Sequence, residues 1–138
     1  MVRIFILTFS ILFSGAGFAG GPTISADDAS VYIISPADGD TVSSPLRVVF
    51  GLRGMGVAPA GTDKANTGHH HLIIDTDLPA ANAPVPADAK HIHFGGGQTE
   101  VEVELTPGTH TLQLLLGDQN HIPHDPPVYS EKITITVK

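Results

Sequence analysis

The 138-residue chain contains no cysteine and no tryptophan, and only two methionines and two tyrosines. Without cysteine there are no disulfide bonds and no thiolate ligands, which excludes cysteine-type structural zinc sites and blue-copper centres. Because Met1 and Met55 are the only methionines, the sequence also argues against a methionine-lined Cu(I) site. The shortage of tryptophan and tyrosine leaves few of the aromatic anchors that protein-docking surfaces prefer.

Basic side chains are scarce as well, with seven Lys and Arg against 14 Asp and Glu. They form no basic stripe of the kind that binds a phosphate backbone, so nucleic acid is not an expected partner. The acidic balance slightly favours cations as ligands.

The one long apolar run lies at the N-terminus and has the pattern of a secretory signal peptide. Arg3 precedes "IFILTFSILF", which is too short to span a bilayer, and "GFA" before Gly20 supplies small residues for cleavage. We expect residues 1–19 to be the signal peptide, 20–29 a short flexible leader and 30–138 a β-sandwich domain. The mature chain would then be periplasmic or secreted, with no membrane span, and would keep six basic side chains because only Arg3 is removed.

The remaining chain alternates apolar and polar residues between clusters of Gly, Pro, Asp and Asn, which is typical of β-strands. In "TEVEVEL", for example, the valines and the leucine share one face and the glutamates share the other. About seven strands are expected in about 119 residues, which predicts an all-β, immunoglobulin-like antiparallel β-sandwich. The predicted strands lie near residues 31–34, 46–52, 69–75, 91–94, 100–105, 110–118 and 130–138.

Seven of the eight histidines fall in three short segments, "NTGHHHLIID", "HIHFGGGQ" and "GDQNHIPHDPP". Side chains alternate between the two faces of a strand. If Leu72 and Ile74 point into the core, His70 shares their face, whereas the two histidines on either side of it point outward. By the same argument His91 and His93 point outward.

Up-and-down strand order brings the three segments to one end of the sandwich. If the strands at 69–75 and 91–94 pair antiparallel, two of their histidines become close neighbours on the outer face. Neutral imidazole is the commonest metal ligand, and without Cys or Met it favours Cu(II) or Zn(II). The predicted metal ligands are His69, His71, His93, His121 and His124. Possible supporting or extra ligands are His70, His91, Asp118 and Asp125.

The same residues also allow a purely structural interpretation. Histidines often satisfy loop carbonyls or are simply solvated. We interpret His110, which follows a "PG" turn, as a hydrogen-bonding corner of the sandwich and not as a ligand. The glycines of "HFGGGQ" allow either a turn with positive φ or a close approach to the backbone beside His93.

The segments "NTGHHHLIID", "HIHFGGGQTEVEVEL" and "PGTHTLQLLLGDQNHIPHDPPVYSEKITITV" resemble a family of small exported bacterial proteins known as a domain of unknown function. The resemblance covers roughly residues 50–138, implies a periplasmic single-domain protein and gives no activity. The stretch "HIHFGG" is also similar to the copper-ligand segment of copper/zinc superoxide dismutases. Those enzymes carry a disulfide, which this chain cannot form.

The function that the sequence favours is a periplasmic metal-binding protein that acts as a copper or zinc carrier, buffer or sensor component. Its metal binding is expected to release protons and to weaken below about pH 6, as imidazoles protonate. The alternative is a non-catalytic module that binds an envelope protein or polysaccharide. A metalloenzyme is less favoured, because no nucleophile–base pair or carboxylate dyad stands out.

Overall fold

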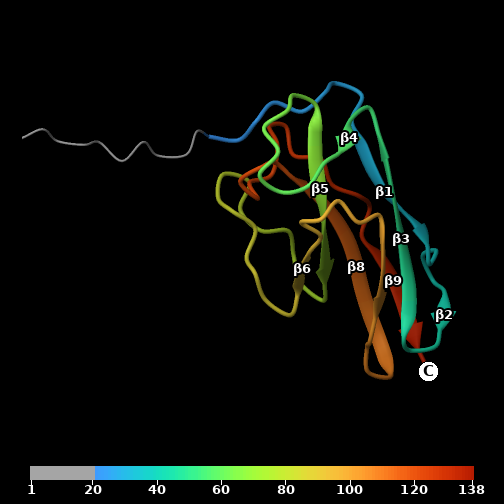
Figure 1. Cartoon of the computed structure of the whole chain (residues 1–138). Helices are drawn as coiled ribbons and strands as arrows, with labels where there is room; N and C mark the ends of the chain where they lie inside the picture. Colours follow the sequence, from blue (N-terminus) through green and yellow to red (C-terminus); the bar gives the residue numbers. More distant parts are fainter. Residues whose placement is uncertain (1–20) are drawn as a thin grey trace, which may run out of the picture.

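The computed structural model of the chain describes residues 21–138, so the expected signal peptide lies outside the described residues. This part of the chain contains nine β-strands and no helix. The described residues therefore include no helix long and apolar enough to cross a membrane. Figure 1 shows the strands and their labels. They are β1 (Ser30–Ser35), β2 (Thr41–Val42), β3 (Leu46–Arg53), β4 (Gly56–Val57), β5 (Thr67–Ile74), β6 (His91–His93), β7 (Glu100–Val103), β8 (Gly108–Gly117) and β9 (Ile133–Val137).

The strands form two sheets, which confirms the predicted all-β sandwich. One sheet has three strands in the order β1-β3-β7; the other has the order β2-β9-β8-β5-β4, and β6 also pairs with β5. The seven strands expected from alternation are all present. The estimate of seven was nevertheless too low, because β2 and β4 are additional and pair parallel with β9 and β5. A strand of two residues shows no alternation that a sequence pattern can reveal.

The main core lies between the two sheets and follows the predicted alternation. Val48 and Phe50 of β3 face Leu72 of β5 and Leu112 and Leu114 of β8, all within one buried apolar cluster. Burying each such side chain stabilises the fold by roughly 1.5–3 kcal/mol. Strands β5 and β8 pair antiparallel beneath this core, and their register fixes the position of each residue along the two strands.

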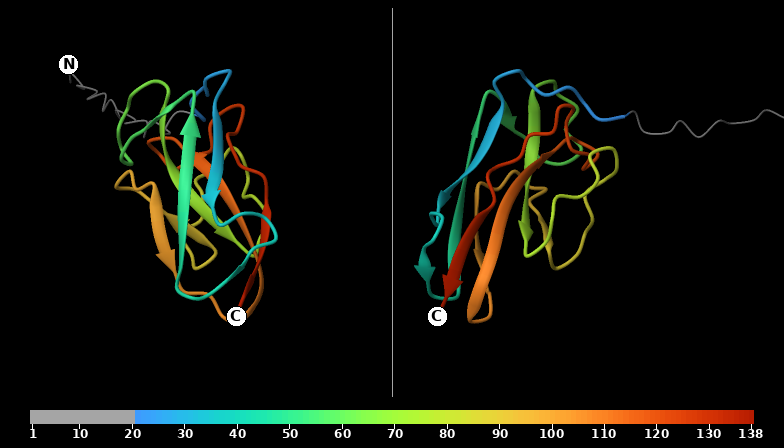
Figure 2. Two further views of the ribbon diagram at one scale, coloured as in Figure 1. Left: turned by 90° about the vertical axis from the view of Figure 1, so that its right-hand side faces the viewer. Right: turned by 180° about the vertical axis from the view of Figure 1, so that it is seen from behind.

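The outer face of the larger sheet is also covered, by the long connection between β5 and β6. Val85 from this connection packs on Ile73 of β5 and Leu115 of β8 in a second, smaller apolar cluster. Figure 2 (right) shows the connection on the side of the larger sheet away from β1 and β3. Strand β5 is therefore buried on both faces from Gly68 to Ile74, whereas the sequence pattern indicated only which residues faced outward.

Candidate metal centre

Strand pairing brings three of the predicted ligands together on the outer face of the larger sheet. His69 and His71 lie two residues apart on β5, and β6 pairs antiparallel with β5 so that His93 lies directly opposite His71. The predicted pairing of these two strands, with His71 and His93 as neighbours, is confirmed. The rings of the two residues are 5.2 Å apart between centroids.

Two glycines leave the space that these imidazole rings occupy. A Cβ on Gly117 of β8 would lie 2.6 Å from Cε1 of His71, and one on Gly95 would lie 2.3 Å from Cε1 of His93. Side-chain carbons do not approach that closely, so both positions need a residue without a side chain for the rings to lie where they do. In "HFGGGQ", the turn interpretation also holds, because Gly97 has a positive φ of 82°.

The fourth histidine comes from the loop that follows β8, and a buried aspartate shapes that loop. Asp118 Oδ1 accepts hydrogen bonds from the backbone N–H groups of Asn120 and Ile122, at 2.8 and 3.0 Å. Between them His121 takes a left-handed conformation with φ 64°, which is uncommon for any residue except glycine. The carbonyl of His121 accepts a hydrogen bond from Val85 N–H at 2.8 Å. The backbone around His121 is thus held in place both by the Asp118 carboxylate and by the hydrogen bond from Val85.

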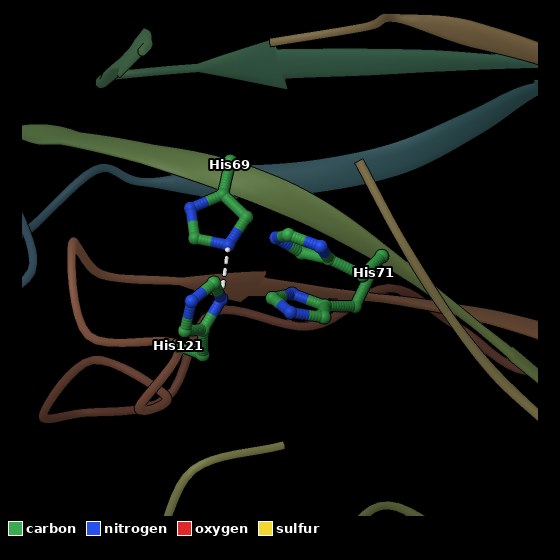
Figure 3. A group of neighbouring side chains, drawn as sticks. His69, His71 and His121 are labelled. Atoms are coloured by element: carbon green, nitrogen blue, oxygen red, sulfur yellow. Dashed lines mark hydrogen bonds between the residues drawn. The ribbon is translucent and has the colours of Figure 1, made fainter. Parts of the chain in front are cut away.

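His69, His71, His93 and His121 form one group, which we call the four-histidine cluster. One ring nitrogen from each residue lies within 4.8 Å of the others. Figure 3 shows three of the rings turned toward a shared space, with a 3.2 Å hydrogen bond between His69 Nε2 and His121 Nδ1. At bond lengths of about 2.0–2.1 Å, the nitrogens on a tetrahedral ion lie about 3.4 Å apart. The most widely separated nitrogens therefore need to close by up to about 1.4 Å, or roughly 0.7 Å per ring, to share an ion.

Burial favours the neutral form of three of the cluster histidines, His69, His71 and His93. His69 and His71 are each 1% exposed. Desolvation, followed by the proximity of the other histidines, lowers the pKa of His69 to about 4 and the pKa of His71 to about 3. Desolvation and then the neighbouring His121 also lower the pKa of the more exposed His93. Neutral imidazole is the form that donates a lone pair to a metal ion.

His71 also carries a polar atom that the described residues leave unpaired. Its Nδ1 is buried and has no hydrogen-bond partner among residues 21–138. A buried polar atom without a partner costs about 1–3 kcal/mol, so such atoms are rare in folded proteins. A cation coordinated by this nitrogen would remove this cost.

The structure does not bring His124 into the cluster, although the sequence grouped it with the ligands. Its ring turns toward the N-terminal segment, where Nδ1 lies 2.8 Å from Thr23 Oγ1, and its Nε2 has no partner within the described part of the chain. Residues in a loop do not follow strand alternation, and the left-handed turn at His121 sends His124 in a different direction. Thr23 and Ser25, within the expected leader, lie against this loop through backbone hydrogen bonds with Asp125.

The remaining predicted residues also lie outside the cluster. His70 faces the main core as expected, 5.2 Å from the ring of Phe50. His91 pairs with Asp88, its Nδ1 lying 2.7 Å from the carboxylate. Asp118 bonds to loop backbone and not to an imidazole, so it positions His121 through the main chain. The contacts of Asp125 with Thr23 and Ser25 run through its backbone.

His110 forms the hydrogen-bonding corner that its position after the turn predicted. Its Nδ1 lies 2.6 Å from the Asp75 carboxylate, and its Nε2 lies 2.8 Å from the carbonyl of Thr106. The same carboxylate accepts a hydrogen bond from Thr111 N–H. These contacts, led by the hydrogen bond to Asp75, raise the pKa of His110.

Sequence reasoning missed the residues that enclose the cluster. A pocket of about 230 Å³ lies between three cluster histidines (71, 93 and 121) and the segment Pro84–Ala87 of the covering connection. This Ala- and Pro-rich stretch carries no periodic pattern and was expected only to be an irregular loop. The sequence feature of this stretch that could have indicated its packing is Val85, an isolated β-branched apolar residue that packs on the sheet.

Comparison with known proteins supports the resemblance noted in the sequence. A family model described as a domain of unknown function (DUF4399) matches residues 48–138, a span that contains the whole four-histidine cluster. No curated protein and no solved structure matches the chain.

Proposed function

Since the chain belongs to this family, a domain of unknown function (DUF4399), we propose a function from the site itself: the protein binds one Cu(II) or Zn(II) ion through the four-histidine cluster. The observation that carries the proposal is the convergence of four imidazoles from three separate segments, with their nitrogens within 4.8 Å of one another. Protonated histidines repel one another, so four imidazoles are not expected to converge beneath a loop by chance.

The chemistry of the donor set supports these two ions. Imidazole suits both Cu(II) and Zn(II), and Cu(II) lies above Zn(II) in general affinity for nitrogen sites. Four neutral imidazoles leave the charge of the ion uncompensated. Asp118, fully buried nearby, opposes the lowering of the pKa of His69 and so supplies negative charge in the same region.

We further propose that the protein works in the periplasm or outside the cell as a metal carrier, buffer or sensor component. The N-terminal sequence pattern supports export. The site is built from a strand, a short paired strand and a constrained loop, so it is largely formed before the ion arrives. A preformed site lowers the ordering cost of binding.

Titration of the purified protein with Cu(II) and with Zn(II) tests the proposal. We expect binding of one ion per chain, and its loss in the double variant His71→Ala, His93→Ala. The matched control is His91→Gln, which removes a histidine of the same strand that lies outside the cluster and should bind as the parent does. Absence of stoichiometric binding, or unchanged binding by the double variant, contradicts the proposal.

A further inference from the structure

The four-histidine cluster is closed on one side and open on another. His71, His93 and His121 line a pocket next to the cluster, whereas His69 does not. The rest of the lining is the segment Pro84–Ala87, which we call the Pro84–Ala87 wall. An ion held by the cluster would therefore face the pocket with the side that its ligands leave free.

The Pro84–Ala87 wall offers little to a charged molecule. Pro84 and Pro86 have no backbone N–H, and the N–H of Val85 is already donated to the carbonyl of His121. No Lys or Arg lines the pocket within the described residues, and the chain as a whole carries a formal net charge of −7. The wall itself therefore supplies no charged side chain that would hold an ionic ligand.

The size of the pocket limits what can enter. About 230 Å³ is below the range of roughly 300–1,000 Å³ that holds drug-sized ligands, and a water molecule occupies about 30 Å³ of liquid. The space suits one small ring or a short side chain. The ligand would be recognised mainly by the ion, because the wall supplies shape and few hydrogen-bonding groups.

The wall is fixed in position by the site itself. Val85 is anchored by the hydrogen bond to His121 and by its packing on Ile73 and Leu115. The pocket next to the cluster is therefore bounded by a segment whose position is fixed by specific contacts.

We propose, on the basis of the proposed metal site, that the bound ion keeps an exchangeable coordination position facing this pocket, and that the position accepts a small neutral nitrogen base of the imidazole type. Cu(II) and Zn(II) both take imidazole, and Zn(II) centres expand from four to five ligands. Such a position gives an incoming ligand access to the ion while the cluster still holds it. In a carrier, this is the step that begins transfer to an acceptor.

The test uses the full mature protein loaded with one equivalent of Cu(II), with imidazole as the probe and the copper spectrum as the readout. We expect imidazole to change the spectrum saturably while copper stays bound. An acetylated and amidated tripeptide with one central histidine distinguishes a free small molecule from a presented side chain. Binding of both probes assigns the position to exchange with a protein, and binding of imidazole alone assigns it to a small ligand.

Variants that fill the pocket locate the binding. Ala87→Phe and Pro86→Phe replace exposed residues of the wall and should each weaken imidazole binding at least tenfold without loss of copper. Ala81→Phe, the matched control on the same connection but away from the pocket, should leave it unchanged. Copper that binds without any response to imidazole, or an imidazole response that both wall variants retain, overturns the inference and leaves the metal site intact. Failure to bind copper at all refutes the proposed function instead.

Discussion

At the residue scale, burial of neutral imidazoles governs the site. In the folded protein the pKa of His69 is lowered to about 4 and the pKa of His71 to about 3, from the ordinary histidine value of 6.5. Metal binding through this pair should therefore resist protonation to a lower pH than the limit of about pH 6 that unperturbed imidazoles imply.

The same lowering makes the metal-free protein sensitive to acid. Between pH 4.5 and 6.5 the unfolded chain binds more protons at these two histidines than the folded chain does, so stability falls as pH falls. Each histidine contributes a slope that reaches at most about 1.4 kcal/mol per pH unit, below the pKa of the unfolded chain and above that of the folded one. Denaturant unfolding in the presence of a chelator should show this slope, and a His69→Gln, His71→Gln variant should be flatter. If the free energy of unfolding depends on pH equally in the two proteins, the burial of neutral His69 and His71 is contradicted.

Gly117 provides a second prediction at this scale. Its replacement by alanine places a Cβ 2.6 Å from His71 Cε1, which must displace the ring. We expect Gly117→Ala to lower Cu(II) affinity at least tenfold, which corresponds to about 1.4 kcal/mol. Gly56→Ala is the control, because its Cβ would meet only an ordinary contact of 3.6 Å. Similar affinities for the two variants, measured by competition titration, would show that the His71 ring position does not matter for binding.

At the element scale, the site depends on β5, β6 and the loop after β8. Alternation in "GHHHLIID" and "HIHF" was enough to predict the faces of His69, His71 and His93, because both segments are strands. It failed for His124, which lies in a loop where side-chain direction follows local turns. The cover over β5 was also not predictable, because the 76–90 connection packs through a few scattered apolar residues, Val85 and the partly buried Leu78, that follow no periodic pattern.

The loop after β8 gives the prediction at this scale. Asp118→Ala removes the acceptor for two buried or partly buried N–H groups, of Asn120 and Ile122. It should lower the free energy of unfolding by about 3 kcal/mol and Cu(II) affinity more than tenfold, since His121 loses its support. Asp118→Asn keeps one carbonyl oxygen at the same place and should therefore retain most of the stability and most of the Cu(II) affinity. If Asp118→Ala binds Cu(II) like the parent, the loop does not position His121.

At the scale of the whole molecule, the cluster joins segments that are far apart in the sequence. An ion held by β5, β6 and the loop after β8 links these three segments in the folded state. Binding to the folded state alone must therefore stabilise the entire domain. The all-β architecture was predictable from composition and alternation, whereas the two short parallel strands and the covered outer face came only from tertiary packing.

Thermal unfolding measures this linkage. With free Cu(II) or Zn(II) at one hundred times its dissociation constant, stability should rise by about 2.7 kcal/mol. For a domain of this size the melting temperature should increase by roughly 10 °C. A chelator should reverse the shift, and the His71→Ala, His93→Ala variant should show none. A shift that survives in the double variant would place the ion elsewhere on the acidic chain.

The most direct test of the metal site is X-ray absorption spectroscopy of protein purified from its native compartment without added metal. The account predicts about one copper or zinc ion per chain, with four imidazole nitrogens at about 2.0–2.1 Å, and a reduced imidazole count or loss of the ion in the His71→Ala, His93→Ala variant. Protein that contains no stoichiometric metal, or an ion surrounded mainly by oxygen ligands, would contradict it.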